Sequence, residues 1–331
     1  MRTFSHIWPQ PLRSKGVDTW PRILYDKSMY RTGYCCINLS LEERFRTMTL
    51  AWANRNKKED VLNKWNSIIK HNFILLYKII SWNIENKVYL YRISSDLIPF
   101  ADHDEWGWMW NEWRGNIENY GLLGPVREII KRYISLGGRF TIHPGQFVSI
   151  GSAKESVRNN SIKNLEYHGQ LLDLMGLPQD YSCPINIHAS NGSKDPNVTA
   201  NYIKNSVSKL SNSVSNRLVL ENEQHGCWHP QNLRKLFPEI PITFDYHHFR
   251  LNDGGIDVGE AVRITSESWP NNDPVQHYSE GRDHPDDPAH SEYIRILPDS
   301  QYDIEVEAKG KDLAIKDFLY GRNQRIENVI Y

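Results

Sequence analysis

The chain has 331 residues, of which 39% are hydrophobic and 24% are charged, a balance typical of a globular protein with one large core or two smaller ones. Its 39 Lys and Arg residues nearly match its 40 Asp and Glu residues, so the formal net charge is −1. Proteins that bind nucleic acids are usually basic, because they neutralise phosphates. The charge therefore argues mildly against a nucleic-acid partner, unless bound cations offset some of the acidic side chains.

Cysteine usage and hydropathy indicate where the protein works. The four cysteines show no C-x-x-C spacing, which argues against a cysteine zinc site or a disulfide framework and favours reduced thiols. The N-terminal segment lacks the apolar run of a signal peptide, and the longest apolar stretch, residues 73–80, is too short to span a bilayer. We expect a soluble, intracellular protein with no membrane partner.

Residues 1–30 show no regular hydrophobic pattern, and we treat them as an extension before one domain at 31–331. Within that domain, strand-like segments occur in the order 32–38, 88–94, 139–142, 184–190, 217–222, 241–248, 273–279 and 302–308. Helical patterns are predicted between them, at 61–79, 126–134, 153–175, 200–210 and 230–237. Eight strands that alternate with helices predict a single-domain α/β protein with a TIM (β/α)8 barrel, and a doubly wound open sheet is the alternative.

Polar side chains follow almost every predicted strand at its C-terminal end, where a TIM barrel carries its catalytic groups. Strand one ends in the segment that runs from Tyr34 to Asn38. The other strand ends carry His103, His143, His188, Glu221, Asp245, His248, His277 and Glu307. One such residue is more often structural than functional, but eight of them on the same rim indicate a common site.

The residue types on this rim suggest a metal centre. Imidazoles and carboxylates without thiolates suit Mn²⁺, Zn²⁺ or Fe²⁺ and are a poor match for Ca²⁺. Eight ligands exceed what one ion needs, so we expect two or three divalent ions. Paired ions of this kind stabilise both oxygens of a phosphoester displacement and activate the attacking water.

At these residues the chain resembles the UV damage endonucleases, metal-dependent TIM-barrel repair nucleases related to endonuclease IV. The resemblance covers about residues 32–320, with the segments in family order. The matching segments are GYCCINLSL (33–41), YRISSDLIPFADH (91–103), HPGQFV (143–148), NIHAS (186–190), LVLEN (218–222), FDYHH (244–248), HYS (277–279), AHSEYI (289–294) and EAKGKD (307–312).

The resemblance implies an endonuclease that incises damaged double-stranded DNA immediately 5′ to cyclobutane pyrimidine dimers and 6-4 photoproducts, with abasic sites as a further candidate lesion. It makes the eight histidines and carboxylates metal ligands, with Glu221 as a bridge between ions. We assign the catalytic role to Glu221, Asp245, His277 and Glu307, and expect Mn²⁺, with Zn²⁺, Mg²⁺ or Co²⁺ as alternatives. We further expect a monomer in the cytoplasm or nucleoid, or in the nucleus or mitochondrion of a eukaryote.

The resemblance also implies the DNA contacts. Gln146 and Phe147 are expected to probe the damaged dinucleotide, and Tyr34 and Asn38 are expected to line the site beside it. His290 is expected to orient a metal ligand or to contact phosphate. Lys309 and Lys311 are candidate phosphate contacts, although lysines at a solvated helix start would look the same.

Two features depart from the family pattern. The family commonly carries a lysine two residues before the histidine of strand seven, and here that position is Val275. This puts a third metal site in doubt. Residues 101–116 are unusually rich in tryptophan, and either a DNA-stacking lid or a segment that packs on its own aromatic rings would explain them.

Two other functions remain open from the sequence. A metal-dependent sugar isomerase of the xylose isomerase type would use the same barrel with carboxylate and histidine ligands, although with more carboxylates and fewer histidines. A non-catalytic protein that binds damaged DNA would explain Val275 and the tryptophans, although all of the carboxylates are still present.

Overall fold

The computed structural model describes residues 30–116, 119–189 and 195–321. The predicted N-terminal extension therefore lies outside the described residues, apart from Tyr30. No helix in the described ranges is both long enough and apolar enough to cross a membrane.

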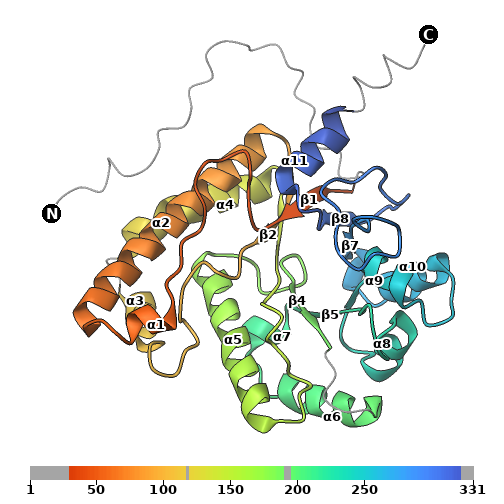
Figure 1. Cartoon of the computed structure of the whole chain (residues 1–331), viewed down its shortest axis with the longest axis horizontal. Coiled ribbons are helices and arrows are strands. Elements are labelled where there is room, and N and C mark those ends of the chain that lie inside the picture. Colours follow the sequence, from red (N-terminus) through yellow and green to blue (C-terminus); the bar gives the residue numbers. More distant parts are fainter. Residues whose placement is uncertain (1–29, 117–118, 190–194, 322–331) are drawn as a thin grey trace.

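Eight parallel strands form one sheet at the centre of the molecule (Figure 1). They are β1 (Thr32–Cys35), β2 (Leu90–Ile93), β3 (Arg139–Ile142), β4 (Ile185–His188), β5 (Leu218–Glu221), β6 (Ile242–Thr243), β7 (Val275–Tyr278) and β8 (Asp303–Val306). The strand order is β6-β5-β4-β3-β2-β1-β8-β7. The two end strands approach each other through a bridge between Asp245 and His277, with the His277 N–H 2.8 Å from the Phe244 carbonyl. The predicted TIM barrel is confirmed.

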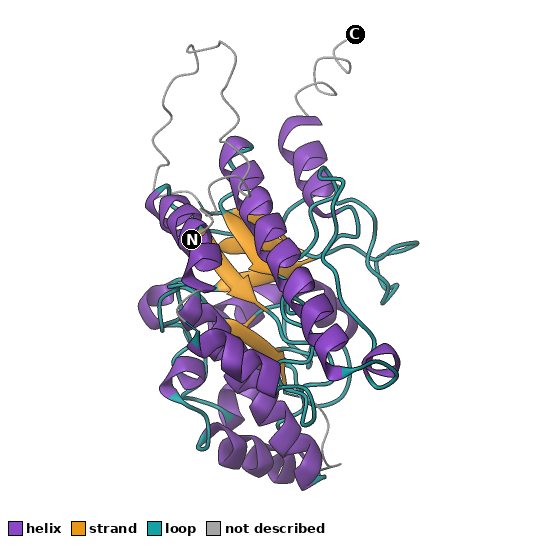
Figure 2. Ribbon diagram, turned by 90° about the vertical axis from the view of Figure 1, so that its left-hand side faces the viewer, coloured by secondary structure: helices purple, strands orange, loops and turns teal. Residues whose placement is uncertain are grey.

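Helices surround the strands, as Figure 2 shows. They are α1 (Leu50–Ala53), α2 (Lys58–Glu85), α3 (Trp108–Gly115), α4 (Tyr120–Ser135), α5 (Glu155–Leu174), α6 (Pro196–Val207), α7 (Asn212–Ser215), α8 (Pro230–Leu236), α9 (Tyr246–Leu251), α10 (Val258–Ser266) and α11 (Lys311–Lys316). The predicted apolar stripe of α2 is buried from Val61 to Ile79. The chain turns after α4 and α5 at Gly137 and Gly176, whose φ angles of 91° and 78° suit glycine.

The predicted sixth strand is wrong in its second half. Only Ile242–Thr243 is extended, and the chain becomes helical at Tyr246. Asp245 caps this helix, because its Oδ1 accepts a hydrogen bond of 2.6 Å from the His248 backbone N–H. The cap brings Asp245 and His248 to the same place at the mouth of the barrel.

The second half of the tryptophan-rich segment is a helix, α3, and three tryptophan rings of the segment are buried. Trp113 stacks on Phe73 with ring centroids 5.7 Å apart, and Trp110 lies 5.9 Å from Trp113. The Trp110 Nε1–H also donates to the Gln170 side chain at 3.1 Å. These contacts favour the packing alternative over a lid for these rings.

The N-terminal end of the barrel holds buried ion pairs next to a small apolar cluster. Asp303 Oδ2 accepts from Arg31 Nη1 at 2.5 Å and from Arg139 Nη1 at 3.0 Å. Beside them, Leu90, Val219 and Val275 form a small buried cluster with Trp269, and Val275 lies opposite Asp303 in the register of β7 and β8. Val275 thus contributes apolar contact and no charge where the family pattern has lysine.

Replacing Asp303 by alanine should lower the free energy of unfolding by about 3 kcal/mol or more, because Arg139 would lose a partner in a buried site. Chemical denaturation measures this. Glu128→Ala, which removes the exposed pair with Lys131 on α4, is the matched control and should leave stability unchanged. Equal stability of the two variants would contradict a structural role for the buried pair.

Candidate metal centre

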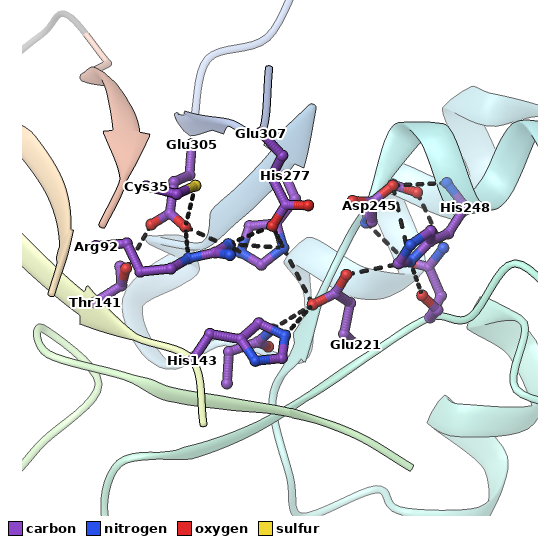
Figure 3. Close-up of polar contacts among 12 residues, drawn as sticks. Cys35, Arg92, Thr141, His143, Glu221, Asp245, His248, His277, Glu305 and Glu307 are labelled. Atoms are coloured by element: carbon purple, nitrogen blue, oxygen red, sulfur yellow. Dashed lines mark hydrogen bonds and ion pairs between the residues drawn. The ribbon is translucent and has the colours of Figure 1, made fainter. Parts of the chain in front are cut away.

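Glu221, the last residue of β5, lies at the centre of the polar cluster at the barrel mouth (Figure 3). Its carboxylate is 1% exposed and lies 3.1 Å from His277 Nδ1, 3.2 Å from His248 Nδ1 and 3.4 Å from His143 Nε2. The Asn186 amide also donates to it. Burial alone would raise the pKa of Glu221, but electrostatic attraction to His277 and the neighbouring histidines outweighs burial, so the pKa lies well below its usual value. Glu221 is therefore ionised at neutral pH.

His143 is held so that one of its ring nitrogens faces Glu221. His143 Nδ1 donates to the Pro144 carbonyl at 2.9 Å, so in the neutral ring Nε2 is an acceptor that faces a Glu221 oxygen. Two acceptors so placed repel each other unless a cation or proton lies between them. A backbone carbonyl that orients the other ring nitrogen is also the usual support of a metal-binding histidine. His143 therefore fits a metal ligand.

His188 and His248 complete this side of the mouth. The His188 ring centroid lies 5.1 Å from that of His143 and 5.6 Å from that of His248. Burial lowers the pKa of His188 to about 4, so its ring is neutral at pH 7, the form that binds metal. His248 Nδ1 donates to the Asn222 carbonyl at 2.9 Å and also lies 3.2 Å from Glu221, so His248, unlike His143, turns a protonated nitrogen toward this carboxylate.

Asp245 gives a second sign that the mouth suits a cation. Its carboxylate is fully buried, and Oδ2 has no hydrogen-bond partner among the described residues. Burial raises its pKa, and the neighbouring charges of Glu221 and Glu307 raise it further. A buried carboxylate oxygen without a donor is unfavourable, and a metal ion would satisfy it.

Among the described residues, three groups of donors could hold a metal ion, each with its donor atoms within 4.8 Å of one another. They are His143–His188–Glu221, Glu221–Asp245–His277 and Cys35–Glu305–Glu307. Glu221 belongs to two groups, so adjacent ions could share it. The first two groups offer only nitrogen and oxygen, which suits Mn²⁺, Zn²⁺ or Fe²⁺.

Arg92, which the sequence analysis missed, separates the third group from the other two. Its Nη2 lies 2.6 Å from Glu307 Oε1 and 2.9 Å from His277 Nε2. Because arginine only donates, the Nε2 that faces it must accept, and His277 carries its proton on Nδ1, toward Glu221. Binding metal through Nδ1 would move that proton to Nε2, against Arg92. Of the predicted ligands in these groups, His277 is the least compatible with its role in this arrangement.

The structure does not bring all of the remaining predicted site residues to the donor groups at the mouth. His290 lies beside the centre, with Nδ1 4.0 Å from Glu307 Oε2. His103 is in none of the three donor groups, and its Nδ1 accepts from the Glu105 backbone at 3.2 Å. Tyr34 and Asn38 are buried and bonded to each other at 2.8 Å. They are therefore not exposed for a nucleotide in this structure.

The exposed candidates lie on loops and helix starts. Phe147 is 86% exposed and Gln146 is exposed beside it, four and three residues after His143. Lys309 is exposed and Lys311 is half-buried at the first residue of α11. All four side chains can be reached from solvent, as a DNA contact requires.

Glu305 and Arg92 were missed because only strand ends were considered. Both residues lie inside strands, and their side chains pair with each other in the barrel interior. The two-residue alternation of β-strands, followed back from Glu307, would have found Glu305.

A TIM barrel whose mouth holds adjacent histidine–carboxylate groups joined by a shared glutamate belongs to the class of barrel proteins with a candidate metal centre. Within that class the family follows from comparison. The family model described as "UV-endonuclease UvdE" matches residues 30–329. The chain belongs to this family, and the resemblance proposed from its motifs is confirmed.

Individual relatives agree with this assignment. The UV-damage endonuclease of Schizosaccharomyces pombe is 30% identical over 313 residues, which are 86% of this chain and 49% of that protein. The UV DNA damage endonuclease of Clostridium perfringens is 30% identical over 301 residues, which are 86% of this chain and 68% of that protein. The chain thus spans about half the length of the first relative.

Solved structures agree on the architecture. The crystal structure of SacUVDE superposes with a TM-score of 0.74 at 26% identity and covers 86% of this chain and 95% of that one. Endonuclease IV from Thermus thermophilus superposes with a TM-score of 0.52 at 14% identity, covering 76% of this chain and 94% of that one, which shows a shared fold.

Adding Mn²⁺ to metal-stripped protein should raise the thermal midpoint by several degrees, because an ion that binds only the folded state adds about 2.7 kcal/mol at a hundredfold excess over Kd. Glu221→Gln should abolish most of that rise, since it removes the shared ligand. Differential scanning calorimetry measures both, with Glu128→Ala as control. An unchanged rise in the Gln variant would show that metal binds elsewhere.

Proposed function

We propose that this chain is a DNA repair endonuclease that incises the phosphodiester backbone 5′ to UV photoproducts. Family membership supports the class of enzyme. The observation that carries the proposal is the joint placement of Glu221 between two donor groups and of an exposed Gln146–Phe147 pair directly after a ligand, His143. Incision of the DNA backbone and recognition of the lesion would then take place at the same end of the barrel.

The residues fit two or three divalent ions, with Mn²⁺ our first choice. Bound ions would activate water and offset charge on the scissile phosphate. Glu221, Asp245, His143, His188 and His248 would hold them. Glu221 is ionised, and Asp245 Oδ2 has no hydrogen-bond partner among the described residues, so both carboxylates are suited to bind a cation.

Other residues near the mouth would orient these ligands or contact the DNA. Asn222 orients two of the proposed ligands, because its side chain forms hydrogen bonds with the Asp245 backbone and its carbonyl accepts one from His248. Glu307 and His290 would face the same mouth from the β8 side. Lys309 and Lys311 are suited to contact phosphate next to the cut, since both are reachable from solvent.

The loop after β3 is suited to detect a weakly stacked, damaged dinucleotide in DNA. The Val148 N–H bonds the Gly145 carbonyl at 3.0 Å, and this turn leaves Phe147 exposed. A crosslinked dinucleotide stacks and pairs poorly, so turning it out of the duplex costs less than turning out normal bases. An aromatic ring in the gap would contribute about 1–3 kcal/mol by stacking. Damaged duplex DNA is therefore the proposed partner of a monomeric, intracellular enzyme.

The two alternative functions are less well supported. A sugar isomerase is disfavoured by the match of the family model over most of the chain. A non-catalytic DNA-binding protein is disfavoured because Glu221, Asp245 and Glu307 all lie in donor groups at the mouth.

The purified protein with Mn²⁺ should nick UV-irradiated duplex DNA and leave undamaged duplex intact, and Glu221→Gln should slow nicking at least about 100-fold, because a metal ligand matters more than the groups that support it. A gel assay on a supercoiled plasmid measures both. Glu128→Ala should behave as wild type. Equal nicking of the two substrates would contradict specificity for damage.

Phe147→Ala should lower affinity for irradiated duplex about tenfold, because one stacking contact is lost, while Mn²⁺ binding stays unchanged. His143→Ala should show the reverse. Fluorescence anisotropy and metal titration measure the two properties, and Leu136→Ala, an exposed apolar change just after α4, is the control for Phe147. Equal loss of metal in both variants would overturn this division of roles.

A further inference from the structure

Next to the proposed metal centre lies a third donor group with an arginine inside it (Figure 3). Arg92 Nε pairs with Glu305 Oε1, and its Nη2 lies 2.6 Å from Glu307 Oε1. The side chain of Arg92 is 9% exposed and that of Glu305 is fully buried. The guanidinium therefore bridges the two carboxylates of the group.

The rest of the group is satisfied without metal. The Thr141 hydroxyl donates to the second oxygen of Glu305, and the Cys35 thiol lies 3.5 Å from the first. Burial raises the pKa of Cys35 well above its usual value, so this side chain is a neutral thiol. A neutral thiol is a poor metal ligand but can donate weakly to a carboxylate.

The balance of charge differs between the two ends of the barrel. At the N-terminal end Arg31 and Arg139 face Asp303 and Asp273, so the charges cancel. At the mouth, Arg92 is the one arginine that pairs with the described donor groups, whose four carboxylates are those of Glu221, Asp245, Glu305 and Glu307. Divalent ions would supply the remaining positive charge, and Arg92 decides which carboxylates stay available to them.

We propose that Arg92 takes the place of a divalent cation in the Cys35–Glu305–Glu307 group and thereby confines metal ions to the donors around Glu221. Arg92 is a positioning residue, which acts through Glu307 and through the acceptor nitrogen of His277. The inference rests on the proposed metal centre. It predicts that removing the guanidinium turns the third group into an additional metal site.

Arg92→Met tests this in the full chain, with Arg139→Met as the matched loss of a buried, paired arginine at the opposite end of the barrel. After metal is stripped with a chelator, Mn²⁺ bound per chain is measured by titration calorimetry and elemental analysis. The thermal midpoint is measured with chelator and with Mn²⁺. Arg92→Lys, which keeps the charge, is the conservative variant.

Arg92→Met should bind one Mn²⁺ more per chain than the wild type, and Arg92→Lys should bind the wild-type number. In chelator both methionine variants should lose about 10 °C of thermal midpoint, because each leaves a buried charge unpaired. Mn²⁺ should restore more of that loss in Arg92→Met than in Arg139→Met. If Arg92→Met folds only when Mn²⁺ is present, the same conclusion follows.

A wild-type metal count in Arg92→Met, with no greater recovery than in Arg139→Met, would overturn the proposal, and so would failure of Arg92→Met to fold even with Mn²⁺. A different result would contradict the proposed metal centre without contradicting the effect of Arg92 on the third group. If the wild type binds no Mn²⁺ while Arg92→Met binds one, Arg92 does keep a cation out of the third group, but the ligand set around Glu221 is wrong.

Discussion

The buried carboxylate of Glu221 is the constraint on which the site depends. A negative charge that is 1% exposed must be matched by donors or cations, and three histidine rings approach it within 3.4 Å. Those rings come from β7, α9 and the residue that follows β3, so the histidines can meet only if the barrel is formed. Fold and site are therefore linked through one side chain.

The two ends of the barrel differ in how their charged side chains are paired. The N-terminal end balances its own charges with Arg31, Arg139 and Asp303, and Val275 packs there in a small apolar cluster. Four carboxylates are left at the mouth, where Arg92 is the one arginine that pairs with the described donor groups. The barrel thus concentrates its need for cations at the end where a loop exposes an aromatic side chain.

Much of the site could be predicted because strand ends can be read from a sequence. The hydrophobic segments that precede His143, His188, Glu221 and Asp245 predict these residues at one rim, and the structure brings them into adjacent donor groups. His103 could not be placed, because a stretch of irregular chain separates it from β2 and leaves its direction open. Which way a long loop points depends on the contacts that it makes.

The sequence by itself determined the eight alternating units and the rim residues, because hydrophobic periodicity and strand ends are local properties. Only the tertiary structure decided that Tyr34 and Asn38 are buried, that three tryptophans pack inside, and that Arg92 lies between two donor groups. These facts depend on which side chains from distant segments share one interior, and local pattern carries no information about such neighbours.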